Sequence, residues 1–379
     1  MICRLVEYQE IRSREHELAQ TYPAPLTAVA SYFPKVVTAS DGSCSWCFFE
    51  EVLPEEGGGQ LYVSVQRSTG GSWSKSRRVA GPFRYGGDVP DCFSVAESRG
   101  ILVLAVASGA SDRTLRVYTS RNGADSFAEQ GLSVQEQTVV GPRLFAAKNG
   151  SFMLFASLGA REVAVDTERQ QYERFAFSLV SSVSPDGASW TPLEPFEPSL
   201  KLSNPFSPFL CPTDEGDVVV FQAQYESERM PRLSNQLYVT VSRDGLASWS
   251  AAALLSGEES VPLSSGYTFA HYHNQRPYLC FMDGRLHLLW ERTLYTTESS
   301  SIWAAELAGD GSLAGAVEQI SLYGSAHRPV LFGYRGTLYA LWFDNRRGVD
   351  SVSAAAKKGL LWTEDPFSFP QGTAVQRFV

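Results

Sequence analysis

The stretch Ser242-Arg243-Asp244-Gly245-Leu246-Ala247-Ser248-Trp249 directly follows an alternating apolar segment at residues 237–241. Serine and aspartate side chains hydrogen-bond nearby backbone amides in tight turns, and glycine tolerates the positive φ that such turns need. The closing tryptophan is large and apolar, and it can pack beside the strand that precedes it. The stretch therefore predicts a stapled turn at the end of a β-strand.

The same kind of turn occurs earlier in the chain with decreasing completeness. Its copies are 184–190, one residue shorter; 120–127, with Asn for Asp and Phe for Trp; and 66–73, which keeps only the Gly-Gly-x-Ser-Trp end. The closing aromatic residues at 73, 127, 190 and 249 are 54, 63 and 59 residues apart. Weaker remnants follow at 309–311 and 359–362. A motif at a regular spacing indicates one structural unit used repeatedly.

Each unit opens near a proline with an apolar run, turns at a glycine and runs apolar again, which is a hairpin signal. The turns are Asp41-Gly42, Arg99-Gly100, Asn149-Gly150, Glu215-Gly216, Asp283-Gly284 and Arg335-Gly336. The second apolar runs are nearly continuous, as expected for inner strands between neighbouring sheets. A third, alternating strand follows in most units, so about four strands per unit are predicted.

These turns resemble the Asp-boxes of the sialidase-like (BNR repeat) β-propeller superfamily, and the resemblance covers nearly the whole chain. It implies an all-β fold: a six-bladed β-propeller of four-stranded antiparallel blades. The expected blades are 30–82, 87–138, 139–200, 204–258, 267–321 and 325–379, with residues 1–20 as a candidate ring-closing segment. In this superfamily the boxes stabilise the fold, and the functional site lies on the opposite, axial loop face.

Sialidases typically carry Arg-Ile-Pro in the first unit and clamp the substrate carboxylate with three arginines. Here the chain reads Tyr32-Phe33-Pro34, and an aromatic ring cannot replace the guanidinium fork. Two later units do open with arginine before proline, so repeat register predicts that both side chains reach one face, where Glu291 or Asp344 could neutralise them. The candidate ligand-binding residues are Arg276, Arg328, Tyr32, Tyr272 and Asp344.

Catalysis stays open at this point. Glycosidases need two carboxyl groups across the scissile bond, and the resemblance implies a Tyr–Glu nucleophile pair with an aspartic acid. The candidates are Glu50, Glu226, Glu291 and Tyr295, although the pattern favours a solvated surface charge for each single carboxylate. The favoured interpretation is a non-catalytic propeller that binds a glycan or protein ligand on its axial loop face. The alternative is a divergent, sialidase-like glycoside hydrolase acting on an acidic sugar.

Composition excludes several other classes. The 379 residues are 44% apolar and carry a net charge of −9 without a Lys/Arg run, so nucleic acid is not an expected partner. No stretch of 18 apolar residues predicts a membrane span. Residues 1–10 lack the apolar core of a signal peptide, which predicts a cytoplasmic protein, or an exported or periplasmic one if a leader is missing.

Two motifs suggest a metal only at first sight. Cys44 and Cys47 would point to opposite faces of a strand, so ordinary core cysteines are expected. His271 and His273 would share a face, but no third ligand is evident nearby. We therefore expect no metal and no cofactor.

Overall fold

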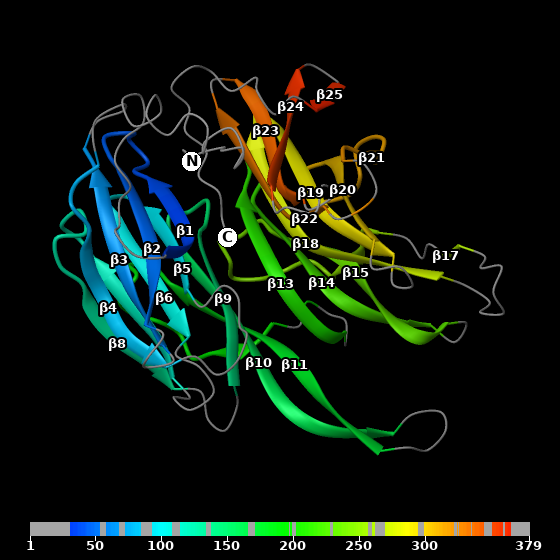
Figure 1. Cartoon of the computed structure of the whole chain (residues 1–379), viewed down its shortest axis with the longest axis horizontal. Helices are drawn as coiled ribbons and strands as arrows, with labels where there is room; N and C mark the ends of the chain where they lie inside the picture. The colour runs from blue at the N-terminus through cyan, green and yellow to red at the C-terminus, as the bar shows by residue number, and fades with distance from the viewer. Residues whose placement is uncertain are drawn as a thin grey trace. The chain divides into compact units, whose positions relative to one another are not determined.

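The computed structural model describes residues 31–53, 58–67, 73–84, 93–107, 114–133, 138–165, 171–196, 198, 202–227, 230–256, 260–261, 270–294, 299–321, 324, 326–334, 336–344, 351–358 and 361–364. The chain divides into two compact units, one built from strands β1–β12 and the other from β13–β25. Each unit is described by itself (Figure 1).

The first unit contains three antiparallel four-stranded sheets, in the orders β1-β2-β3-β4, β5-β6-β7-β8 and β12-β11-β10-β9. The strands are β1 Ser31–Thr38, β2 Ser45–Leu53, β3 Gly58–Gln66, β4 Arg77–Arg84, β5 Phe93–Ser98, β6 Ile101–Ala107, β7 Thr114–Ser120, β8 Ala128–Ser133, β9 Thr138–Ala146, β10 Phe152–Val165, β11 Gln171–Ser184 and β12 Glu194–Pro195.

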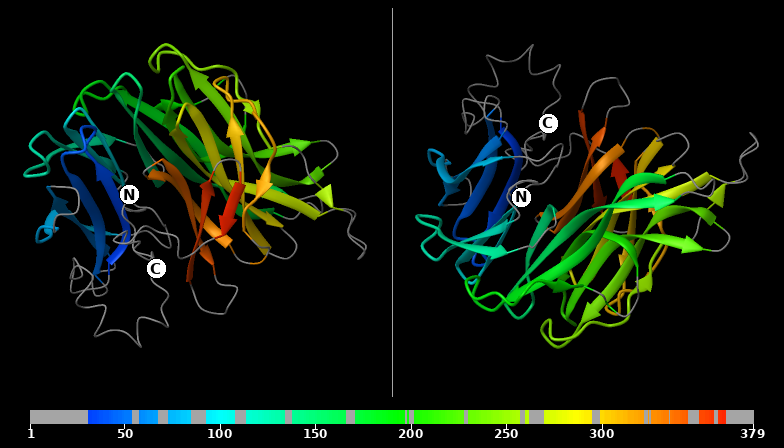
Figure 2. Two further views of the ribbon diagram at one scale, coloured as in Figure 1. Left: turned by 90° about the horizontal axis from the view of Figure 1, so that it is seen from above. Right: turned by 90° about the horizontal axis from the view of Figure 1, so that it is seen from below.

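The second unit also contains three antiparallel sheets, in the orders β13-β14-β15-β16, β17-β18-β19-β20-β21 and β22-β23-β24-β25. The strands are β13 Ser203–Pro212, β14 Asp217–Ser227, β15 Met230–Ser242, β16 Ala253–Leu254, β17 Ser260–Val261, β18 Ala270–Met282, β19 Arg285–Leu294, β20 Ser299–Leu307, β21 Glu318–Gln319, β22 Ala326–Tyr334, β23 Thr337–Asp344, β24 Ser351–Lys358 and β25 Leu361–Glu364. Figure 2 shows the same strands from two further directions.

The all-β class and the four-stranded antiparallel sheets are confirmed, and every regular element in the described ranges is a strand. One sheet differs from the expectation, because the short strand β17 adds a fifth member before β18. All six predicted turn glycines have positive φ, from +70° at Gly336 to +157° at Gly216. The six-bladed ring and its blade boundaries stay predictions, and residues 1–20 lie outside the described residues.

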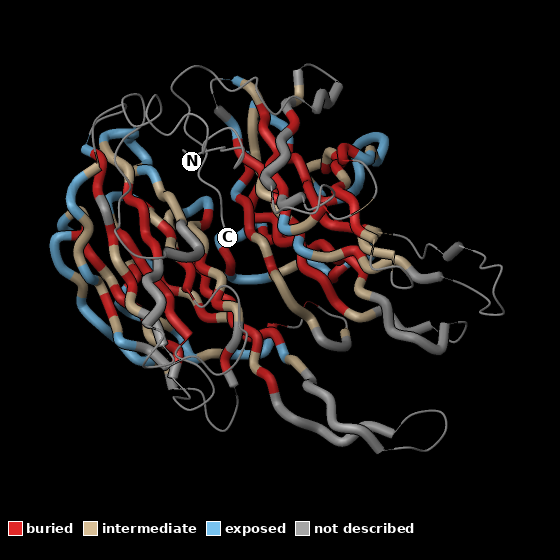
Figure 3. Tube along the Cα trace, viewed as in Figure 1, coloured by how far each residue is buried: buried red, intermediate tan, exposed pale blue. Residues whose placement is uncertain are grey.

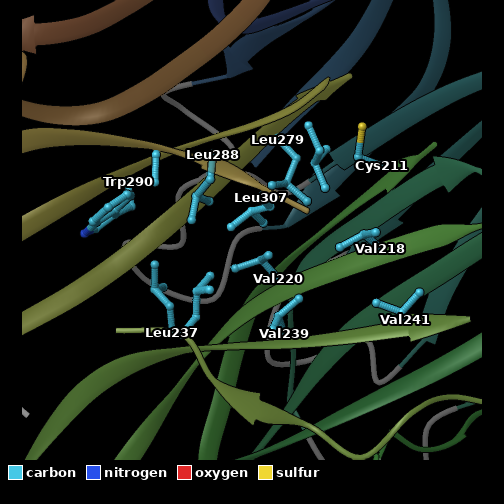
Figure 4. Packing of buried hydrophobic residues seen from close by; sticks show 13 residues of the cluster. Cys211, Val218, Val220, Leu237, Val239, Val241, Leu279, Leu288, Trp290 and Leu307 are labelled. Atoms are coloured by element: carbon cyan, nitrogen blue, oxygen red, sulfur yellow. The ribbon is translucent and has the colours of Figure 1, made fainter. Parts of the chain in front are cut away.

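The core lies between consecutive sheets of each unit. The second strand of most sheets is the most buried one (Figure 3), and β6 is buried at every position after its first. Figure 4 shows one core cluster of the second unit, in which Val220 and Val239 pack with Leu288 and Trp290. Burying one such side chain contributes roughly 1.5–3 kcal/mol. None of the described residues forms a helix long and apolar enough to cross a membrane.

The predicted turns are held by their own side chains. Asp244 Oδ1 accepts hydrogen bonds from Ser242 Oγ at 3.0 Å and from the Ser248 amide at 2.9 Å. The bonds from Ser248 are the largest effect that lowers the pKa of Asp244. Trp190 is half-buried, packs against the core, and donates from Nε1 to the Gly187 carbonyl at 3.2 Å. These side chains stabilise the turns locally, as the sequence predicts.

Candidate functional site

Several first strands share a bulge at the residue before their proline. The pairing register shifts between Phe206 and Phe209, between Gln275 and Tyr278, and between His327 and Val330. At these bulges Ser207, Arg276 and Arg328 have φ of +48°, +53° and +51°, and Gly141 before Pro142 in the first unit has +56°. A residue with a side chain loses about 1–2 kcal/mol in this left-handed region, and glycine does not. Arginine at two of these positions is therefore held at an energetic cost.

Glu291 of β19 lies between the two arginines. Its side chain is 1% exposed. Oε2 accepts hydrogen bonds from Arg276 Nη1 at 2.7 Å and from the Arg328 backbone nitrogen at 3.0 Å. Oε1 accepts from Gln275 Nε2 at 2.8 Å and lies 3.1 Å from Nδ1 of His327. With the Thr293 hydroxyl at 3.2 Å, five donors surround one carboxylate.

These contacts fix the ionisation state of Glu291. Burial is the largest single effect and would raise its pKa, but the hydrogen bond from His327 and the charge of Arg276 outweigh burial. Together with the backbone amide of Arg328 they lower the pKa to about 2 from 4.5. The carboxylate therefore stays ionised at neutral pH and holds no proton to donate.

The two arginines differ in how much of their charge is used internally. The Arg276 side chain is 43% exposed and forms the ion pair with Glu291 through Nη1. Arg328 is exposed and contributes its backbone nitrogen to Glu291. In the part of the chain that the structure describes, the Arg328 guanidinium has no ion-pair partner. One positive charge is thus neutralised by Glu291, and the other faces solvent.

A second side chain repeats the role of Glu291 one sheet earlier. Gln222 of β14 is 7% exposed, and its Oε1 accepts a hydrogen bond from the Arg276 backbone nitrogen at 2.9 Å. Gln222 pairs with Phe206 as Glu291 pairs with Gln275, just before each bulge. The sequence analysis missed Gln222, although both residues lie 14 positions after the proline of their unit. That spacing was the available signal.

The remaining candidates are only partly placed. Glu50 pairs with Tyr32, which is the same register position as Glu291 opposite Gln275. Glu226 and Asp344 lie in β14 and β23. The side chains of these four residues, and the whole of Tyr295, lie outside the described residues.

Tyr272 is engaged within its own sheet. The guanidinium carbon of Arg292 lies 4.0 Å from the centroid of the Tyr272 ring and 4.6 Å from that of Trp303. Arg292 is 7% exposed, so this cation–π sandwich is buried and covers one face of Tyr272. That face is closed to a ligand.

The cysteine and histidine pairs at 44/47 and 271/273 are only partly described. Nδ1 of His273 accepts from the Asn235 backbone nitrogen at 3.1 Å, and the side chain of His271 lies outside the described residues. Cys47 is buried, and Cys44 packs against the core cluster that contains Trp46 and Phe48. No group of His, Cys, Asp and Glu suited to a metal ion occurs in the described ranges.

Comparisons with known proteins place the chain by fold. No known protein family and no curated protein sequence matches it. A solved polysaccharide lyase of family PL25, an ulvan lyase, has a TM-score of 0.54 at 12% identity, over 91% of this chain and 83% of the lyase. A protein of unknown function from Dyadobacter fermentans scores 0.50 at 13% identity, over 86% and 93%. The sialidase of Trypanosoma rangeli scores 0.48 at 12% identity, over 86% and 54%.

At these identities the likeness shows the fold alone. In the ranges that the structure describes, the chain is an all-β protein of antiparallel sheets, five with four strands and one with five, and its fold neighbours are β-propellers. What those neighbours do is a property of those proteins.

Proposed function

We propose that the second unit binds an acidic carbohydrate at Arg276 and Arg328, and that it does so without cleaving it. The observation that carries this proposal is the pair of arginines in left-handed backbone beside one buried carboxylate. Strained residues of this kind persist where the surrounding structure holds them, and they cluster at ligand sites. Since glycine occupies the equivalent bulge at position 141, the cost at positions 276 and 328 points to a use for the arginine side chains.

The chemistry of the exposed groups favours an anionic ligand. A guanidinium presents several donors in a plane that matches a carboxylate. Arg276 uses Nη1 for Glu291 and is still 43% exposed, so part of its donor edge faces solvent together with Arg328. A carbohydrate is the favoured class because a polysaccharide lyase is among the fold neighbours.

Glu291 is a poor candidate for an acid catalyst. A general acid must hold its proton near the working pH, whereas the pKa of Glu291 is about 2. Its lone pairs are also occupied by five donors. We therefore assign Glu291 to positioning the arginines. The hydrolase alternative would rest on other carboxyl groups.

Binding to an array of acidic and neutral oligosaccharides tests the proposal, with Arg328→Ala as the variant. Arg285→Ala is the matched control, because Arg285 is exposed and lies at the turn of the β18–β19 hairpin, away from Arg276 and Glu291. We expect salt-sensitive binding of acidic glycans that Arg328→Ala weakens about tenfold or more, equivalent to ~1.4 kcal/mol. Arg285→Ala should bind normally. Unchanged binding in Arg328→Ala, or turnover of aryl glycosides by the wild type, would contradict the proposal.

A further inference from the structure

Two side-chain amides flank Arg276. Gln275 precedes it in β18, and Gln222 approaches from β14 of the neighbouring sheet. Gln275 Nε2 donates to Glu291 Oε1 at 2.8 Å and lies 3.4 Å from Thr293 Oγ1. Gln222 Oε1 accepts from the Arg276 backbone nitrogen. Each amide thus uses one of its two ends for the scaffold.

The direction of both amides is fixed by these partners. If the Gln275 amide were flipped, its carbonyl oxygen would face the ionised Glu291, and two acceptors would lie together. An amino group of Gln222 turned toward the Arg276 N–H would place two donors together. Amide orientation is assigned by such networks. The free end of Gln275 is therefore an acceptor, and the free end of Gln222 is a donor. Neither free end has a partner among the residues that the structure describes.

We infer that Gln222 and Gln275 are specificity-determining residues that select a sugar acid with a hydroxyl group beside its carboxylate. The inference rests on the proposed function of the same site. The carboxylate would lie on the exposed edge of Arg276, where the Gln222 amino group adds a neutral donor. The Gln275 carbonyl would accept the proton of the neighbouring hydroxyl. A hexuronate offers this set, with its carboxylate on C5 and a hydroxyl on C4.

The selection follows from the burial of the amides. Gln222 is 7% exposed and Gln275 is half-buried, so a bound ligand removes their free ends from water. A ligand without the matching group then leaves a buried polar atom unpaired, which costs about 1–3 kcal/mol. A sulfate ester supplies an anion but no adjacent hydroxyl in the same geometry. A site built this way rejects the incomplete ligand more strongly than an apolar pocket would.

Calorimetric titration with methyl glucuronide, its 4-deoxy analogue and glucose 6-sulfate tests the inference. Wild-type protein should prefer the glucuronide about tenfold over either of the others. Gln275→Met, which keeps the length of the side chain but removes its amide, should bind both glucuronides equally. Gln222→Met should bind both more weakly while keeping the preference. Gln130→Met is the matched control, because Gln130 is an exposed glutamine in β8 of the other unit.

The preference is a ratio measured within one variant, so a modest loss of stability does not imitate the result, and melting curves verify folding. Equal binding of all three ligands by the wild type, still weakened by Arg328→Ala, would overturn the inference and leave the proposed function standing. A preference that survives in Gln275→Met would also overturn it. Binding of none of the three ligands would overturn the inference, while the glycan array decides the proposed function separately.

Discussion

Replacing Glu291 with glutamine should destabilise the second unit and flatten its response to acid. The amide has one acceptor where the carboxylate has two. Whichever way it turns, its amino group meets donors: Arg276 and the Arg328 amide on one side, or Gln275 and His327 on the other. At least two buried contacts are lost in either orientation.

The pKa of Glu291 sets the magnitude. A carboxyl group at about 2 in the folded protein, against 4.5 for an ordinary glutamate, corresponds to about 3 kcal/mol at neutral pH, because each pH unit is worth about 1.4 kcal/mol. Since the folded-state pKa is depressed, this contribution is complete above pH 4.5. It is lost as the pH falls through about 2. For a unit of this size 3 kcal/mol lowers the melting temperature by roughly 6–12 °C.

Thermal unfolding of wild type and Glu291→Gln at pH 7, 4.5, 3 and 2 measures both effects. We expect the gap between the two proteins to be largest at pH 7 and to shrink below pH 4.5. Glu129→Gln is the control, because Glu129 is half-exposed in a surface ion pair with Arg116 and such pairs contribute at most about 1 kcal/mol. A gap of less than 1 kcal/mol at pH 7, or one that is independent of pH, would refute the role assigned to Glu291.

Two further predictions concern the scaffold. Gly187→Ala should lower the free energy of unfolding in urea by about 2–4 kcal/mol, because the φ of Gly187 is +71° and the new Cβ would lie 2.5 Å from Val103 Cγ2. Gly123→Ala is the control, because a Cβ at this equivalent turn would have nothing within 4 Å, and it should lose only about 1 kcal/mol. Equal losses in the two variants would contradict this packing argument. Cys211 should resist alkylation in the native protein at pH 8, because burial raises the pKa of its thiol to about 12. If mass spectrometry finds Cys211 alkylated as fast in the native protein as in the urea-unfolded protein, this prediction is wrong.

The strands were predictable where hydrophobic periodicity alone determines them. The apolar run at 101–107 has the same bounds as β6. The run at 152–157 is only the buried start of β10, which continues to Val165 in pairing with β11. Backbone pairing continues the hairpin past the end of the apolar pattern, and a hydrophobic pattern carries no signal for that extension.

The site was predictable only in part for a related reason. Arginine before proline indicated positions 276 and 328, and Glu291 and Asp344 were the two acids that could neutralise them. The left-handed backbone at both arginines could not be foreseen, because a residue before proline is expected to be extended. At the bulge in β22 the contact to Glu291 comes from the backbone nitrogen of Arg328, whereas the guanidinium that reaches Glu291 belongs to Arg276.

The bulges explain how the chain varies charge at the site without changing its framework. At two of them a backbone N–H donates to a side chain of the preceding sheet at one register position: Arg276 to Gln222, and Arg328 to Glu291. Glutamine and glutamate have nearly the same shape, so either satisfies the inter-sheet hydrogen bond. Only the glutamate adds a negative charge, and that charge is what the guanidinium of Arg276 pairs with. Among the side chains of Gln222, Arg276, Glu291 and Arg328, a neutral partner at 222 and a charged one at 291 therefore leave one positive charge without an ion-pair partner, that of Arg328.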